Sequence, residues 1–141
     1  MPAIDCPFRT AEAELQRLDS VGVDCALVDF HGEASSEKQA IAHFLDGRVG
    51  AVVGTHSHVQ TADERILAGG TAAITDVGMC GCFDSVIGVK KELSIQKFLT
   101  QRPVRYEPAE GPGGYGCVII DLDESTGKAR SIRRIRESAI D

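Results

Sequence analysis

The first half of the chain alternates stretches of helical hydrophobic spacing with short, continuous apolar runs. Apolar positions recur at near-helical spacing in residues 10–20 and 36–47, with a glycine at or just after each end, so both stretches are predicted as helices. The mostly apolar runs 24–30 and 49–53 have the length and composition of buried strands. Together these segments predict a β-α-β unit, in which helices pack on the face of a sheet.

The second half of the chain is richer in predicted strands. Residues 65–77 hold two β-prone runs joined by Gly69 and Gly70, a pattern typical of a hairpin. Helical spacing returns in residues 90–100, whose polar face is basic. Three further strands are predicted, of which the last two form a hairpin: 102–107, 115–123 and 128–137.

These elements predict a mixed α/β fold in a single structural unit. The chain has 141 residues, which is within the usual size of one domain. We find no internal repeat, low-complexity tract or composition break that would mark a linker. Residues 1–141 are therefore treated as one unit.

Composition and charge narrow the classes of partner. The net charge of -6 argues against a broad surface for extended nucleic acid, but it leaves room for a small phosphate ester held by a metal. No stretch approaches the roughly 18–20 uninterrupted apolar residues of a membrane span, and the start lacks the pattern of a signal peptide. The five cysteines are odd in number. We therefore expect no membrane contact and a reduced, cytoplasmic setting.

The segment GTHSHVQT carries the most distinctive candidate chemistry. It places His56 and His58 one residue apart, directly after the apolar run 49–53, and His31 follows the apolar run 24–30. Ligands bind at the carboxyl ends of parallel strands, so the three imidazoles could meet there and hold a borderline transition metal. The alternative for each is a hydrogen-bonded loop histidine. His43, within a predicted helix, is left out of this set.

Four residues near these histidines could orient or supplement metal ligands. Metal-bound imidazoles commonly donate their other N–H group to a carboxylate or a carbonyl oxygen. The candidates flank the histidines or follow a strand: Asp29, Glu33, Thr55 and Asp76. The sequence is equally compatible with Glu33 as a solvated acid before the next helix. It is also compatible with Asp76 as a residue that caps a turn.

A rival metal site uses cysteine. Cys80 and Cys82 form a C-x-C pair that, with His56 and His58, would supply the four ligands of a closed structural zinc site. Thiolates in such sites usually have C-x2-C spacing, which makes this the weaker alternative. The chain would then be a structural or interaction module.

The sequence also resembles that of a known protein family. The segment GTHSHVQTADERIL, together with DFHGE at residues 29–33, is similar to the C-terminal half of the YmdB-type calcineurin-like metallophosphoesterases. The resemblance implies part of a metallophosphoesterase-type α/β sandwich ending in a β-hairpin. It also implies two metal ions, typically iron or manganese with zinc also compatible, and hydrolysis of small phosphodiesters such as 2',3'-cyclic nucleotides. On this pattern His31 and His56 would bind one metal and His58 the other.

The chain departs from the family pattern in what it lacks. The remaining ligands and the proton donor of the family lie in an N-terminal half, and this chain has no G-N-H motif and no asparagine at all. We therefore expect a C-terminal fragment of a longer enzyme, assign no catalytic residue, and expect negligible activity from the isolated chain. A shortened relative that keeps the fold only for binding is also compatible. A half-sandwich would expose apolar surface, so a homo-oligomer is expected.

Overall fold

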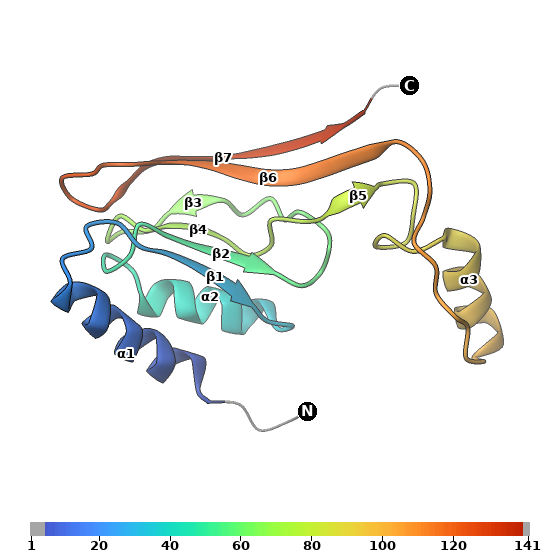
Figure 1. Cartoon of the computed structure of the whole chain (residues 1–141), viewed down its shortest axis with the longest axis horizontal. Coiled ribbons are helices and arrows are strands. Elements are labelled where there is room, and N and C mark those ends of the chain that lie inside the picture. Colours follow the sequence, from blue (N-terminus) through green and yellow to red (C-terminus); the bar gives the residue numbers. More distant parts are fainter. Residues whose placement is uncertain (1–4, 140–141) are drawn as a thin grey trace.

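The structure is a computed structural model and describes residues 5–139. It contains three helices and two β-sheets within this range (Figure 1). The elements, in chain order, are α1 (Pro7–Ser20), β1 (Leu27–His31), α2 (Ser35–Phe44), β2 (Ala51–Thr55), β3 (Arg65–Ile66), β4 (Ala72–Ile74), β5 (Cys80–Cys82), α3 (Lys91–Thr100), β6 (Gly113–Leu122) and β7 (Ala129–Ser138).

The first sheet has the strand order β1-β2-β4-β3. Strands β1, β2 and β4 are parallel, and β3 pairs with β4 in the antiparallel direction. In the β1–β2 register Leu27 pairs with Ala51 and His31 with Thr55, so the two strands end side by side. This register brings the residues that follow both strands to one edge of the sheet.

The second sheet is antiparallel, with the order β5-β6-β7. Its main part is the long β6–β7 hairpin, in which Cys117 pairs with Ile135. The hairpin lies on the side of the first sheet opposite α1 and α2 and contacts β3 and β4 (Figure 1). The fold therefore has three layers: helices, a mostly parallel sheet, and a hairpin, with α3 set to one side.

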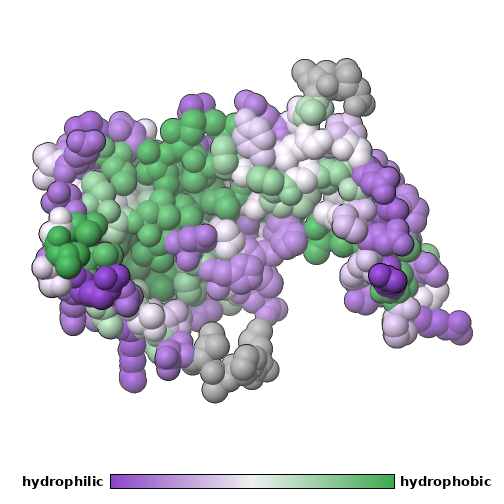
Figure 2. Space-filling model, in the orientation of Figure 1, coloured by the Kyte–Doolittle hydropathy of each residue, from purple (hydrophilic) through white to green (hydrophobic). Residues whose placement is uncertain are grey.

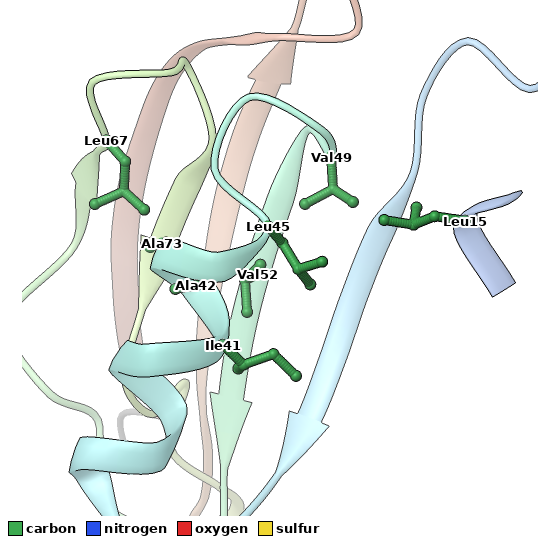
Figure 3. Packing of buried hydrophobic residues seen from close by; sticks show 8 residues of the cluster. All are labelled: Leu15, Ile41, Ala42, Leu45, Val49, Val52, Leu67 and Ala73. Atoms are coloured by element: carbon green, nitrogen blue, oxygen red, sulfur yellow. The ribbon is translucent and has the colours of Figure 1, made fainter. Parts of the chain in front are cut away.

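The core lies between the helices and the first sheet (Figure 3). Ile41, Ala42 and Leu45 project from α2 and its end, with 4% or less of their surface exposed. Their spacing of one, three and four residues places them on one helix face. They pack against Val52 of β2 and Leu15 of α1. The helical spacing visible in the sequence thus corresponds to the buried face of α2.

Most predicted elements are confirmed. The helices predicted at 10–20, 36–47 and 90–100 correspond to α1, α2 and α3, and the hairpin predicted at 65–77 corresponds to β3 and β4. The final hairpin is formed by β6 and β7. Helix α1 begins earlier than predicted, with Pro7 at its first position, where the missing N–H of proline costs nothing.

Two predictions about strands were wrong. Residues 102–107 form no strand, and this segment contains Pro103, which cannot donate to a β-ladder. The strand predicted at 24–30 exists as β1 but is not buried, because it is an edge strand with a single neighbour. Leu27 in it is 57% exposed. Local hydrophobicity identified this strand but could not indicate its position in the sheet.

Apolar side chains remain on the surface. Figure 2 shows them gathered over the body of the molecule on the face in view. Besides Leu27, the exposed apolar residues include Phe98 and Leu99 of α3, which are 76% and 79% exposed. Within residues 5–139, no helix has the length and hydropathy needed to cross a membrane.

Candidate metal centre

Two of the predicted ligands, His31 and His56, meet at the carboxyl ends of adjacent parallel strands. His31 is the last residue of β1, and His56 directly follows β2. The Nε2 atom of His31 lies 3.2 Å from Nδ1 of His56. The two rings are 5.1 Å apart between centroids and inclined at 72°. The parallel register of β1 and β2 is therefore what brings together two residues that are 25 positions apart in the chain.

Thr55 holds the ring of His31. Its Oγ1 atom lies 3.0 Å from Nδ1 of His31, so the hydroxyl occupies one ring nitrogen and leaves Nε2 facing His56. This is the arrangement in which a neighbouring polar group orients an imidazole ligand. Thr55, a residue expected to orient ligands, thus contacts His31 directly.

The third histidine is oriented by a backbone carbonyl. Nδ1 of His58 lies 2.9 Å from the carbonyl oxygen of Ile87. Because a carbonyl oxygen only accepts hydrogen bonds, Nδ1 must carry the proton in this contact. Neutral His58 therefore presents an unprotonated Nε2, the form in which imidazole binds metals.

The backbone at this site adopts unusual conformations. His56 has φ 145°, His58 has φ 62° and Ile87 has φ 49°, all in the region that favours glycine. Three of the four non-glycine residues with positive φ in the described chain lie here. Such strain costs about 1–3 kcal/mol at each residue and tends to gather at functional sites.

A buried carboxylate fixes the loop that carries His56 and His58. Asp76, 1% exposed, accepts hydrogen bonds from the N–H groups of Ser57 at 2.7 Å and Gly78 at 2.9 Å. Burial by itself would raise the pKa of Asp76, but these N–H groups and the ammonium of Lys38 hold that pKa below its ordinary value. Asp76 thus supports the backbone between the histidines and does not contact their rings.

Lys38 is a site residue that was not predicted from the sequence. It is 5% exposed, and its Nζ atom lies 3.2 Å from Oδ2 of Asp76 and 3.4 Å from the carbonyl oxygen of Thr55. The sequence could have indicated its burial, because Lys38 lies three residues before Ile41 and so on the apolar face of α2. A lysine there has to bury its charge against a partner.

Asp63 provides a second carboxylate in this network. It bonds the hydroxyl groups of Thr61 and Thr75 and accepts the N–H of Thr75. Burial raises the pKa of Asp63, but these hydrogen bonds outweigh it and hold the pKa below its ordinary value. The hydroxyl oxygen of Thr61 in turn accepts the N–H of Asp76, and the backbone N–H of Thr61 donates to the carbonyl oxygen of Asp76. The two carboxylates therefore stabilise one continuous loop.

The two other residues expected to orient ligands lie apart from this network. Asp29 and Glu33 are exposed, and neither side chain has a hydrogen bond or an ion pair within the described residues. Asp29 lies in β1 two residues before His31 and lines the groove between that strand and α1. No hydrogen bond or ion pair among residues 5–139 links either carboxylate to an imidazole.

The geometry of the histidine pair fits a metal ion, but the ligand set is incomplete among the residues that the structure describes. Two nitrogens 3.2 Å apart, each about 2.1 Å from one ion, subtend about 100°, between the octahedral and tetrahedral angles. Across residues 5–139, however, no three His, Cys, Asp or Glu side chains lie close enough to hold a metal. His58 therefore does not lie close enough to His31 and His56 to complete such a group, and the rival set with Cys80 and Cys82 does not form one either.

The comparisons with known proteins identify the family. The family model described as YmdB-like protein matches residues 1–135. The chain belongs to this family. It is 49% identical over 135 residues to a 2',3'-cyclic-nucleotide 2'-phosphodiesterase of Bacillus subtilis, covering 96% of this chain and 51% of that protein. It is 39% identical over 131 residues to a putative phosphatase/phosphodiesterase of Mycoplasma pneumoniae, covering 92% and 46%.

Solved structures of this fold agree with the assignment. A hypothetical protein from Thermus thermophilus matches with a TM-score of 0.89 and 38% identity, over 98% of this chain and 53% of that one. A novel phosphatase of Mycoplasma pneumoniae matches with a TM-score of 0.89 and 37% identity, over 98% and 49%. The resemblance to the YmdB family and the α/β fold class are confirmed. The chain spans about half the length of the relatives it matches.

Proposed function

We propose that the chain forms part of a metal-dependent phosphodiesterase that acts on small phosphate esters such as 2',3'-cyclic nucleotides. The observation that supports this most directly is the His31–His56 contact at the ends of two parallel strands. It occurs in a chain whose relatives are named as phosphodiesterases and phosphatases. The phosphoesterase relatives suggest dependence on metal ions, and imidazole nitrogens are suitable ligands.

The proposed cofactors are two transition-metal ions, iron or manganese, with zinc also compatible with the ligand type. His31 and His56 would hold one ion, and Nε2 of His58 would face the other. The bound ions would supply Lewis-acid activation of water and of the phosphate oxygens. The three imidazoles act as neutral ligands, and no proton transfer is assigned to any residue of this chain.

The supporting residues have distinct parts in this proposal. Thr55 fixes the ring of His31, and the carbonyl of Ile87 fixes the tautomer of His58. Asp76 and Lys38 hold the backbone of the loop between His56 and His58. Asp29 and Glu33, which have no hydrogen bond to an imidazole among the described residues, stay candidates to orient or supplement the metal ligands.

The chain is further proposed to be the C-terminal half of a metallophosphoesterase domain. Its relatives are about twice as long, and the two-histidine pair leaves coordination positions for ligands from elsewhere. The isolated chain should then bind metal weakly, because neutral ligands do not compensate the charge of a metal pair. It should hydrolyse phosphodiesters negligibly.

A cytoplasmic location and self-association complete the proposal. All five cysteines are free, which suits a reducing compartment. The net charge of -6 disfavours extended nucleic acid as a partner. The exposed Leu27 of the edge strand β1 favours a homo-oligomer.

The metal site can be tested by calorimetric titration of Mn²⁺ and Zn²⁺ into the 141-residue chain. Weak binding is expected for the unaltered protein and for Cys80→Ser, and it should be lost in His31→Ala. His43→Ala is the matched control, because His43 lies on the exposed side of α2. Turnover of bis-p-nitrophenyl phosphate should be negligible in every variant.

Three results would contradict the proposal. Tight one-to-one zinc binding that disappears in Cys80→Ser would assign the chain to a structural zinc module. Metal binding that is unchanged in both His31→Ala and His56→Ala would place the ions elsewhere. Robust, His56-dependent turnover by this chain alone would overturn the part of the proposal that makes it half of a site.

A further inference from the structure

A pocket of about 170 Å³ lies beside the histidine loop. His58 forms one wall of it, next to Val59 and Gln60. Other lining residues come from the second sheet and the turn after β5, among them Phe83, Ile87 and Arg136. Pockets that enclose a whole drug-sized ligand are about 300–1,000 Å³. This one is therefore sized for one part of a ligand whose remainder lies outside it.

Arg136 is the distinctive charged group of this pocket. Its guanidinium carbon lies 4.4 Å from the centroid of the Phe83 ring. Two other arginines of β7 have ion-pair partners, Arg130 with Asp123 and Arg134 with Glu64. Arg136 has none within the described residues. A stacked guanidinium is held in one plane, and its donors remain available along its edge.

Gln60 has a defined orientation at the same pocket. Its Nε2 atom donates to the carbonyl oxygens of Cys117 at 2.9 Å and Ile135 at 3.1 Å. Since both partners only accept, the amide nitrogen must face them, and this fixes the amide against a flip. Its Oε1 atom has no hydrogen bond among the described residues. The pocket residues thus include a planar set of donors and an unused acceptor.

We propose that this pocket is the nucleobase subsite of a nucleotide substrate and that Arg136 recognises the base. The inference rests on the proposed function, which places the phosphoryl group at the histidines. His58 belongs to both places, so a nucleotide bound there would direct its base into the pocket. Val59, Met79 and Ile87 supply apolar surface for the faces of a ring.

The polar groups favour guanine among the bases. A guanidinium edge pairs bidentately with the O6 and N7 acceptors of guanine, whereas adenine presents an acceptor next to a donor. Guanine also carries N–H donors, for which Oε1 of Gln60 is a suitable acceptor. A good bidentate pair discriminates by about tenfold or more. Recognition of this kind distinguishes a base from a bare phosphate.

The test is calorimetric titration of the 141-residue chain with guanosine 3'-monophosphate, adenosine 3'-monophosphate and inorganic phosphate. The guanosine nucleotide should bind about tenfold more tightly than the adenosine nucleotide. Arg136→Ala and Arg136→Lys should both lose this preference, because lysine keeps the charge but not the planar fork. Arg133→Ala, on the same strand and outside the pocket, should keep it, and circular dichroism should show all variants folded.

The outcomes separate this proposal from the proposed function. Equal binding of the two nucleotides, equal binding of inorganic phosphate, or an unchanged preference in Arg136→Lys would each overturn the base subsite. None of these results bears on metal binding by His31 and His56. Conversely, loss of metal binding with retained guanine preference would leave the pocket assigned and remove the metal site.

Discussion

Lys38 and Asp76 bury opposite charges directly beneath the histidine loop. The pair is 3.2 Å apart, and the two side chains are 4% and 1% exposed. Removing charged groups from water is costly, and such a pair is tolerated when further hydrogen bonds satisfy it. Asp76 has two such bonds, from Ser57 and Gly78. The N–H groups of Ser57 and Gly78 and the ammonium group of Lys38 therefore together make a carboxylate acceptable at this point.

Replacing Lys38 with methionine should destabilise the protein strongly. Lys38→Met keeps most of the side-chain volume but leaves Asp76 buried without its cation, which typically costs about 3–5 kcal/mol. Urea unfolding at pH 7 measures the change in the free energy of unfolding. Lys91→Met, which breaks the exposed pair with Asp84, should cost much less. Equal losses in the two variants would contradict a special role for Lys38.

Acid should weaken the fold through Asp63 and Asp76. Both carboxyls have a folded pKa below the ordinary value, about 3.9 for an unfolded aspartate. Their stabilisation is thus fully present above about pH 5 and is lost progressively as the pH falls through the folded values. Urea unfolding at pH 7, 4 and 3 should show this decline.

The control for the acid effect is a pair of variants. Asp63→Asn should be less stable at pH 7 and should lose less stability between pH 4 and 3, because one of the two titrating groups is gone. Asp121→Asn alters an exposed residue of β6 and should leave the decline unchanged. A decline that is the same in Asp63→Asn would assign it to other groups.

At the residue scale, the sequence pattern indicated that His31 and His56 would lie together, as they do, while their role as metal ligands stays a prediction and two neighbouring residues were not anticipated. An H-x-H motif follows one apolar run, and a single histidine follows another apolar run. When the two runs form adjacent parallel strands, the histidines after them lie close together at the same edge of the sheet. The contact of His31 with His56 agrees with that expectation. Lys38 and Ile87 could not be found in the same way, because one is hidden in a helical pattern and the other acts through its backbone carbonyl.

Strand β2 is the element that positions the site. It lies between β1 and β4 and is buried from Ala51 to Gly54. At its end, Gly54 allows close approach of β4 and α2, since an added Cβ would overlap the carbonyl oxygen of Thr75 and lie 2.9 Å from Cδ of Lys38. A larger residue there would push Thr55 and His56 out of line.

Gly54→Ala should therefore destabilise the protein by about 1–3 kcal/mol or more, the usual cost of overpacking. Metal binding should weaken in parallel, because His56 is two residues away. Thermal unfolding and calorimetric metal titration measure the two effects. Gly113→Ala, at a glycine whose added Cβ would meet nothing within 4 Å, is the control. A neutral Gly54→Ala would show that the end of β2 is looser than the structure indicates.

At the element scale, whether a segment forms a helix or a strand was easier to predict than whether that element is buried. The helices and the two hairpins follow local periodicity and turn residues, which are present in short segments. The exposure of β1 depends on which strand becomes its neighbour, and that is decided by distant parts of the chain. The failed strand at 102–107 shows the same limit, because β-prone composition without a pairing partner does not form a sheet.

At the scale of the whole molecule, the first sheet is open at the edge formed by β1. Strand β1 is at the edge of its sheet, and Leu27, Val28 and Phe30 contribute to an apolar groove between β1 and α1. An edge strand with exposed apolar side chains is a template for association. The sequence predicted exposed apolar surface from the family resemblance, and it could not specify which strand would carry it.

Association through this edge should depend on protein concentration. Sedimentation velocity should show species larger than the monomer for the unaltered chain, and Leu27→Lys should shift the distribution toward monomer by placing a charge on the edge. Leu99→Lys, on α3 and away from β1 (Figure 1), should have little effect. A monomer at all concentrations would contradict this expectation.

The amide of Gln60 has a mechanical consequence. By donating to carbonyls on both strands of the β6–β7 hairpin, it fastens the segment that follows His58 to a ribbon contributed by a remote part of the chain. Local opening events usually involve whole cooperative units. Deuterium uptake at the loop that carries His56 and His58 should therefore rise together with uptake in the β6–β7 hairpin. Local opening of the hairpin would then also loosen the segment in which the imidazoles lie.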